Sequence, residues 1–260
     1  MNVIMNRVLA LGMAGMLCMS DTGFARELAD TVKVLRDSVV AVGTFQAGRA
    51  PRFEFLGTGF AVGDGSYVVT NEHVPPAVPD FEHYERIAVL TGTGSSTQAH
   101  MADVVARDHE HDLLLLKVEG LALKPLHFGD STQATEGDAL AFTGFPLGTV
   151  LGIYPVTHRA TLSSVTPIVI PVVESKDLSV KSIRELRKTP FDVFQLDGTA
   201  YPGNSGSPLY DPSTGRVMGI VNMVFVKTTK EKALSEPSGI AYAIPAKYIV
   251  DMLKGAGVGP

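Results

Sequence analysis

A glycine-rich stretch from Tyr201 to Tyr210, YPGNSGSPLY, contains the first residue type that could carry chemistry, a serine hydroxyl. Ser205 lies two residues after Gly203 and directly before Gly206, at the edge of an apolar run. Glycines weaken a strand unless the backbone needs a conformation that only glycine adopts easily, so they predict a sharp turn at the serine. Such a turn could aim the N–H groups of Gly203 and Ser205 into one cavity. Taken alone, the stretch also fits a simple turn.

An imidazole and a carboxylate are the partners that a serine nucleophile needs, because the hydroxyl must lose its proton and the imidazole must keep one tautomer. His73 follows an apolar strand in VVTNEHV, and Asp112 precedes another in HDLLLLKV. Asp108 is a rival carboxylate, but it precedes a polar run, whereas Asp112 borders the predicted buried strand. The sequence therefore predicts His73, Asp112 and Ser205, in this chain order, as a set for nucleophilic catalysis.

Short β-branched or apolar segments separated by turn residues dominate the chain and predict an antiparallel all-β architecture, either a barrel or a sandwich. Asp64–Gly65 indicates a hairpin. The segment 126–138 lacks a strand pattern and divides the strands into two comparable sets, so two small barrels joined by a linker fit the 260 residues. Apolar residues at helical spacing predict an N-terminal helix over 28–39 and a C-terminal helix over 245–255.

The blocks TNEHV, HDLLLLKV and GNSGSPL resemble the three catalytic blocks of chymotrypsin-fold (trypsin-like) serine proteases, and they are closest to the bacterial HtrA (DegP-like) branch. GTGFAV before the histidine, FTGFPLG after the linker and GIAYAIPAKYI near the C-terminal end extend the similarity over about residues 39–253. The resemblance implies two six-stranded antiparallel β-barrels with a short N-terminal helix and a C-terminal helix. It places the first barrel within 26–128 and the second within 129–260.

The resemblance also implies a role for each residue of the catalytic set. Ser205 would be the nucleophile of a serine endopeptidase, His73 the general base and then acid, and Asp112 the carboxylate that orients the imidazole. Gly203 and Ser205 would supply the amides of the oxyanion hole. Protein or peptide substrates are expected on the same basis, and no metal or cofactor is.

The substrate pocket is placed by the resemblance around the segments 221–223 and 241–243, with its base six residues before the nucleophile. The predicted pocket residues are Thr199, Val221, Asn222, Met223, Ala241 and Ala243. The base carries no acidic residue, so we expect cleavage after small or medium aliphatic residues rather than after Arg or Lys.

Several features depart from the family pattern. Asn204 stands where zymogen-activated relatives have an aspartate that pairs with a new N-terminus, so activation by N-terminal cleavage is not expected. Ser207 stands where the branch usually has glycine, a small change that should leave the hydroxyl of Ser205 accessible. The stretch 167–194 is longer than the pattern and predicts a regulatory or specificity loop. The PDZ modules usual in the branch are not expected in this chain.

Residues 1–25 have the pattern of a secretory signal peptide, with Arg7 before an apolar core and small residues ahead of a cut after Ala25; an anchor helix is the alternative. Cys18, the single cysteine, lies in this segment, so the mature chain would have neither disulfides nor a cysteine nucleophile. We expect an exported protein, periplasmic or extracellular, without stable membrane insertion after cleavage. The net charge of −5 argues against nucleic acid as a partner, since phosphate binding needs a basic surface.

Two other functions stay open on the sequence alone. The chain could be a catalytically silent binding or chaperone-like module whose cleft is closed by the 167–194 loop, or an esterase that uses the same triad. Zinc at His109, Glu110 and His111 is disfavoured, because two imidazoles without an obvious third ligand make a poor site. A homo-oligomer also stays open, since N-terminal segments can mediate trimers in the HtrA branch.

Overall fold

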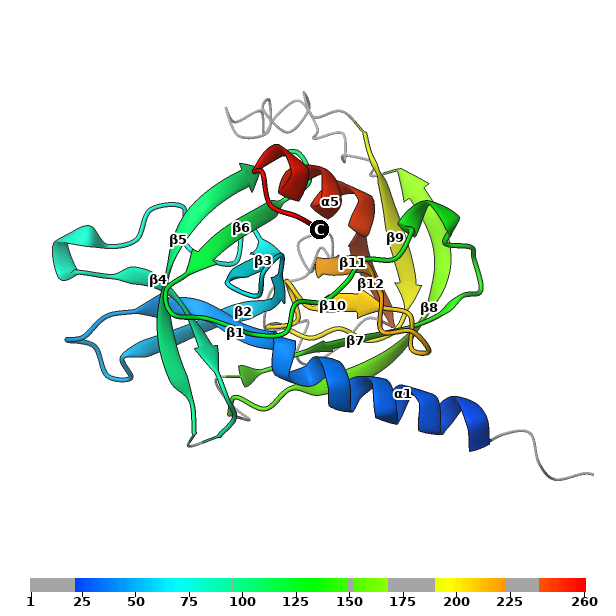
Figure 1. The fold of residues 1–260 in the computed structure, drawn as a ribbon, viewed down its shortest axis with the longest axis horizontal. Coiled ribbons are helices and arrows are strands. Elements are labelled where there is room, and N and C mark those ends of the chain that lie inside the picture. The colour runs from blue at the N-terminus through cyan, green and yellow to red at the C-terminus, as the bar shows by residue number, and fades with distance from the viewer. Residues whose placement is uncertain (1–21, 95, 149–151, 168–189, 223–238) are drawn as a thin grey trace, which may run out of the picture.

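Short strands form most of the computed structural model, which describes residues 22–94, 96–148, 152–167, 190–222 and 239–260. The strands are β1 (Val39–Phe45), β2 (Phe53–Val62), β3 (Tyr67–Asn71), β4 (Arg86–Thr91), β5 (Gln98–Asp108), β6 (Leu113–Val118), β7 (Ala139–Gly144), β8 (Val156–Pro167), β9 (Asp192–Asp197), β10 (Pro208–Tyr210), β11 (Val217–Asn222) and β12 (Ile240–Pro245). They close into two antiparallel barrels, ordered β1-β2-β3-β6-β5-β4 and β10-β11-β12-β9-β8-β7 (Figure 1). The prediction of two six-stranded barrels is confirmed.

Buried apolar side chains gather into three clusters, one inside each barrel and one between the barrels. Strand β6 contributes to two of them: Leu114 and Leu116 belong to the core of the first barrel, and Leu113 and Leu115 to the cluster between the barrels. Both faces of β6 are therefore covered, which explains why its sequence is a continuous apolar run instead of an alternating one. Burial of each leucine contributes about 1.5–3 kcal/mol, so this strand helps to fix the two barrels against each other.

Helix α1 (Thr22–Leu35) precedes the first barrel, and a short 3₁₀ turn (Arg36–Ser38) joins it to β1. The helix therefore ends before Val39, which the sequence pattern had included in it. Val39 begins the β-branched run VVAV, whose pairing with β2 and β4 outweighs the helical spacing of the preceding residues. Residues 1–21 of the predicted signal segment lie outside the described residues, and α1 begins at Thr22, before the predicted cut.

Each terminal helix reaches the barrel that lies farther along the chain from it, in addition to the elements next to it in the chain (Figure 1). Leu35 of α1 belongs to the apolar cluster that includes Val217 of β11, in the second barrel. Helix α5 (Ala246–Gly255) follows the second barrel directly, yet it contacts β5 and β6 of the first. There the ring of Tyr248 stacks on that of His111, with centroids 3.9 Å apart. Helix α5 also packs on β11 and β12 of the second barrel, so it contacts both barrels.

The turns and loops refine the predicted boundaries. The predicted hairpin at Asp64–Gly65 joins β2 to β3, and Gly65 has a φ of +86°, which favours glycine. The position predicted for the barrel boundary, 128/129, falls in the linker between β6 and β7. The predicted loop 167–194 is bounded by β8 and β9, and Phe194 is already part of β9. Its polar segment, 174–188, lies outside the described residues.

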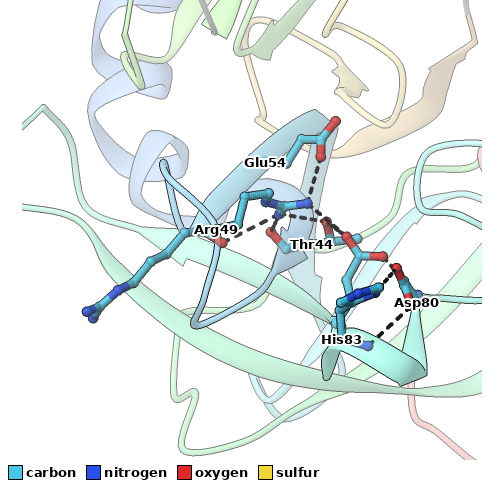
Figure 2. A network of polar contacts seen from close by, with 7 residues as sticks. Thr44, Arg49, Glu54, Asp80 and His83 are labelled. Carbon is cyan, nitrogen blue, oxygen red and sulfur yellow. Dashed lines mark hydrogen bonds and ion pairs between the residues drawn. The ribbon is translucent and has the colours of Figure 1, made fainter.

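A polar network holds the turn between β1 and β2 against the segment that precedes β4 (Figure 2). The Arg49 guanidinium donates to Glu54 at 2.7 Å and to Glu85 at 2.9 Å. Glu85 also accepts a hydrogen bond from the Thr44 hydroxyl at 2.6 Å and one from the backbone N–H of Asp80 at 3.0 Å. The Asp80 amide, followed by Thr44 and Arg49, holds the pKa of Glu85 below its ordinary value. The network therefore ties together two neighbouring connections of the first barrel.

Candidate active site

The first barrel places an imidazole and a carboxylate at two adjacent strand ends. Asn71, the last residue of β3, pairs with Leu113, the first residue of β6, so His73 and Asp112 lie next to each other. One carboxylate oxygen of Asp112 lies 2.6 Å from Nδ1 of His73, and the other accepts a hydrogen bond from the His73 backbone N–H at 2.9 Å. Asp112 has a φ of +53°, which is uncommon for a residue with a side chain. The carboxylate therefore holds both the backbone and the ring of His73.

The second barrel presents Ser205 on the turn that precedes β10. Its Oγ lies 3.0 Å from Nε2 of His73, the ring nitrogen opposite to the one that faces Asp112. Gly203 and Gly206 have φ values of +102° and +89°, so the backbone on both sides of the serine adopts conformations that favour glycine. A Cβ on Gly206 would overlap the carbonyl oxygen of Thr58 in β2. The turn therefore needs glycine at position 206 both for its backbone conformation and for its close contact with the first barrel.

The order of atoms across the cleft is suited to proton transfer. A carboxylate only accepts hydrogen bonds, so Nδ1 of His73 carries the proton that faces Asp112. Nε2 then has a free lone pair, 3.0 Å from the Ser205 hydroxyl. This is the distance and the tautomer that a general base needs to take a proton from a serine.

Two carbonyls of the serine turn are held by β2, next to the amides predicted to form the oxyanion hole. Gly203 O accepts a hydrogen bond from Thr58 Oγ1 at 2.7 Å, and Ser205 O accepts one from the Thr58 backbone N–H at 2.8 Å. Within the described residues, the N–H of Gly203 has no hydrogen-bond acceptor. It is therefore available to a substrate oxygen.

Asn222 has a contact that its predicted position in the pocket did not suggest. Its side-chain amide donates to Asp112 at 2.7 Å, on the same oxygen that faces the ring of His73. Asn222 is fully buried at the end of β11, so this amide crosses from the second barrel to the acid–base pair of the first. The sequence carried one signal for this role, because a polar residue ends the otherwise apolar strand VMGIVN.

The other predicted pocket residues lie in different surroundings. The side chains of Val221, Ala241 and Ala243 belong to the apolar core of the second barrel, so only their backbone can face a substrate. Thr199 is half-buried in the segment after β9, and Met223 lies outside the described residues.

The histidines near the triad are engaged by neighbouring carboxylates. Nδ1 of His111 lies 2.7 Å from Asp108, and Nδ1 of His109 lies 2.8 Å from Glu72. Burial raises the pKa of Asp108, but hydrogen bonds from the side chain and backbone of His111 outweigh it and lower this pKa overall. Asp112, not Asp108, is the carboxylate that contacts His73. In the part of the chain that the structure describes, no three His, Cys, Asp or Glu side chains are grouped to hold a metal.

Two polar side chains are buried beneath the serine turn. The side-chain amide of Asn204 and the hydroxyl of Ser207 have no hydrogen-bond partner within the described residues. A Cβ placed on Gly144 would lie 3.0 Å from Oδ1 of Asn204 and would overlap the Ser207 hydroxyl, so β7 approaches both closely. An aspartate at position 204 would bury a charge without a cation, which is consistent with the amide found there.

The sequence matches known families over most of its length. Residues 57–220 match the model of the trypsin-like peptidase domain. A probable periplasmic serine endoprotease, DegP-like, from Chlamydia trachomatis is 33% identical over 205 residues, which cover 77% of this chain and 34% of the relative. A protein of the same description from Brucella suis is 32% identical over 203 residues, which cover 76% of this chain and 32% of the relative. The chain therefore spans about a third of the length of these curated relatives.

Solved structures share the fold. The HtrA-type protease AlgW with a tripeptide has a TM-score of 0.64 at 24% identity, over 88% of this chain and 62% of that one. The active form of the Rv3671c protease from M. tuberculosis has a TM-score of 0.64 at 22% identity, over 92% of this chain and 88% of that one. At these identities the similarity establishes the fold. No described helix is both long enough and apolar enough to span a bilayer.

Proposed function

Because the chain belongs to the trypsin-like peptidase domain family, we propose that it is a serine endopeptidase whose triad is His73, Asp112 and Ser205. The observation that carries the proposal is the 3.0 Å distance between Nε2 of His73 and Oγ of Ser205, with Asp112 on the opposite ring nitrogen. The DegP-like relatives are described as serine endoproteases, which supports the same reaction. Protein or peptide substrates are proposed from these relatives and from the peptide-bound AlgW structure.

The reaction would proceed through an acyl-enzyme. Oγ of Ser205 attacks the carbonyl carbon of the substrate while its proton moves to Nε2 of His73. The carbonyl oxygen becomes negative and accepts hydrogen bonds from the backbone amides of Gly203 and Ser205. Nε2 then gives its proton to the leaving amine, and the C–N bond breaks. A water molecule then loses a proton to Nε2 while its oxygen attacks the acyl carbon. The bond between that carbon and Oγ of Ser205 breaks, Oγ takes the proton back from Nε2, and the carboxylic acid product leaves.

Asp112 would stabilise the imidazolium that forms twice in this cycle. Its carboxylate contacts the ring of His73 and accepts hydrogen bonds from the His73 backbone and the Asn222 amide, so it is fixed before the charge on the ring appears. Such fixed partners need no reorganisation during the reaction, which is the main advantage of an enzyme site over water.

Export to the periplasm or the extracellular space is proposed from the signal-peptide pattern of residues 1–25 and from the periplasmic description of the DegP-like relatives. Cell fractionation with an antibody would test it, because the exported form would migrate as the shorter, cleaved chain. An uncleaved chain in the cytoplasm would contradict it.

A fluorophosphonate probe tests the proposed nucleophile directly. We expect the folded wild-type protein to be labelled, Ser205→Ala to lose all labelling, and His73→Ala to be labelled about 10³-fold more slowly. A folded wild-type protein that resists the probe would instead support a catalytically silent binding module. Digestion of casein separates the remaining alternatives: labelling and ester hydrolysis without any cleavage of casein or peptides would support an esterase.

Cleavage preference is proposed to be for small or medium aliphatic residues, because no acidic side chain is present at Thr199, the predicted base of the pocket. A peptide library in which the residue directly before the scissile bond is varied over all amino acids tests this preference. A dominant preference for Arg or Lys would contradict it.

A further inference from the structure

We propose that Thr58 is a positioning residue for the oxyanion hole: it orients the serine turn of the second barrel from its place on the first. The inference rests on the proposed function, because it assigns Thr58 a part in that reaction. Thr58 lies in β2, one strand away from the β3 end that carries His73 and two strands away from the β6 end that carries Asp112, and it is completely buried.

Every polar atom of Thr58 has a partner, and the partners come from different segments. The backbone N–H donates to Ser205 O at 2.8 Å, and the hydroxyl donates to Gly203 O at 2.7 Å. The hydroxyl also accepts a hydrogen bond from the N–H of Phe145, the residue after β7, at 3.1 Å. The carbonyl of Thr58 accepts one from the hydroxyl of Thr70 in β3 at 2.7 Å. Thr58 therefore joins the serine turn, the end of β7 and β3.

The hydroxyl of Thr58 acts on the peptide planes around Gly203. It holds the Gly203–Asn204 peptide through Gly203 O, and the amide of Asn204 donates in turn to Tyr201 O at 2.9 Å. The preceding peptide, which carries the N–H of Gly203, is held through Pro202 O by the N–H of Leu147 at 2.9 Å. With both planes fixed, the dihedral angles of Gly203 are fixed, and so is the direction of its N–H.

Packing around Gly203 leaves little freedom for a different arrangement. A Cβ on Gly203 would lie 3.0 Å from the ring of Phe55, which is also on β2, and would overlap the carbonyl oxygen of Phe145. A φ of +102° at Gly203 has no steric cost for glycine, so hydrogen bonds and packing must select it from the other conformations open to this residue. The Thr58 hydroxyl provides the one side-chain bond among the described contacts of Gly203.

Only a hydroxyl can serve both neighbours at once, because it donates one hydrogen bond and accepts another at the same atom. Valine has the same shape as threonine but would leave Gly203 O and the N–H of Phe145 buried without partners. Serine keeps the hydroxyl and loses only a methyl group. Thr58→Val and Thr58→Ser therefore separate the hydrogen bonds from the volume of the side chain.

The test compares kcat and KM on one peptide substrate with the rate of fluorophosphonate labelling. Loss of a direct oxyanion donor lowers kcat about 10²–10³-fold, so we expect about a 10- to 100-fold loss of kcat for Thr58→Val, which disturbs that donor indirectly. KM should change less than about threefold, and Thr58→Ser should restore kcat to within about fivefold of wild type. The rate of labelling should fall in parallel with kcat, because the probe also needs the oxyanion hole.

Thr44→Val is the matched control, because it removes another buried threonine hydroxyl from the first barrel, the one that donates to Glu85. It is expected to lower the melting temperature without changing kcat per folded enzyme. Wild-type activity in Thr58→Val, or equal loss in Thr58→Val and Thr58→Ser with both folded, would overturn the inference. An unlabelled wild-type protein would instead overturn the proposed function, so the two failures are distinguishable.

Discussion

The two sides of the cleft are built by different physical means. On the first barrel, His73 and Asp112 lie at strand ends and are held by hydrogen bonds that they make to each other and, for Asp112, to Asn222. On the second barrel, Ser205 lies in a turn between Gly203 and Gly206. The backbone conformations of these two glycines allow the turn to pack closely against β2. The acid–base side is therefore held through its side chains, by the Asp112 carboxylate and its hydrogen bonds, whereas the nucleophile side is held through its backbone, by glycine conformations, steric fit and the hydrogen bonds from Thr58.

The two sides should therefore tolerate different substitutions. The acid–base side has polar groups with matched partners, so its function depends on the identity of the side chains. The turn around Ser205 depends on the absence of side chains at Gly203 and Gly206, where a single methyl group would overlap backbone oxygens of the neighbouring segments.

Gly206→Ala should have the largest effect, because it changes the conformational side of the cleft. The new Cβ would overlap the Thr58 carbonyl at a φ of +89°, so we expect a loss of unfolding free energy on the order of 4 kcal/mol and no fluorophosphonate labelling. Gly120→Ala is the control: its φ is +66°, but nothing lies within 4 Å of a Cβ there, so only the left-handed strain of about 1–2 kcal/mol is added. Equal unfolding free energies in denaturant for the two variants would refute the steric argument.

Asp112→Asn should leave the fold intact and remove activity through the other side of the cleft. An amide at this position favours the wrong tautomer of His73, so kcat is expected to fall about 10⁴-fold with little change of KM. Asp108→Asn, four positions earlier, removes the carboxylate that contacts His111 and should retain most of kcat. Steady-state kinetics of both variants measures the two losses of kcat. A comparable loss in Asp108→Asn would argue against Asp112 as the carboxylate that orients His73.

Asn222→Ala tests the side-chain contact that Asn222 makes from the second barrel to the Asp112 carboxylate. A hydrogen bond to a charged group contributes about 1.5–3 kcal/mol, so removing it should lower kcat/KM about tenfold or more. Asn222→Asp should be worse than alanine, because a second carboxylate would then face Asp112 and raise the energy of the ionised pair. Unchanged kcat/KM in the alanine variant would mean that Asp112 is held by the first barrel alone.

His158→Phe should have the smallest effect, on the pH dependence of stability rather than on catalysis. His158 stacks on Phe142 inside the second barrel, and burial lowers the pKa of its imidazole below the ordinary value of about 6.5. The unfolded chain therefore binds a proton more readily than the folded one, so stability falls as the pH drops below about 6.5, by at most about 1.4 kcal/mol per pH unit. Below this pH the phenylalanine variant should lose less stability than wild type. The same dependence of the unfolding free energy on pH in the two proteins would contradict this.

Much of the fold could be predicted from the sequence, because its signals are local. Turn residues separate the strands, and the apolar run Leu113–Leu116 predicted a buried strand, which the structure covers on both faces. The proximity of His73, Asp112 and Ser205 could be predicted because each lies in a recognisable block. Val39 was assigned to a helix by its spacing alone, whereas its β-branched neighbours place it in β1.

The contacts of Thr58 and Asn222 could not be predicted, because their partners are distant in the chain. Thr58 contacts a residue 145 positions away, and Asn222 contacts one 110 positions away. Nothing in a stretch such as GTGFAV distinguishes a threonine on a strand from one that bonds across an interface. Similarly, helical spacing gives the apolar face of α1 but not the barrel that this face covers.

The packing of α1 and α5 against distant parts of the chain has a consequence for the way the molecule unfolds. Leu35 belongs to the same apolar cluster as Val217 of the second barrel, and Tyr248 stacks on His111 of the first barrel. Opening one barrel would expose apolar surface of the other, so we expect the two barrels to unfold together in a single transition.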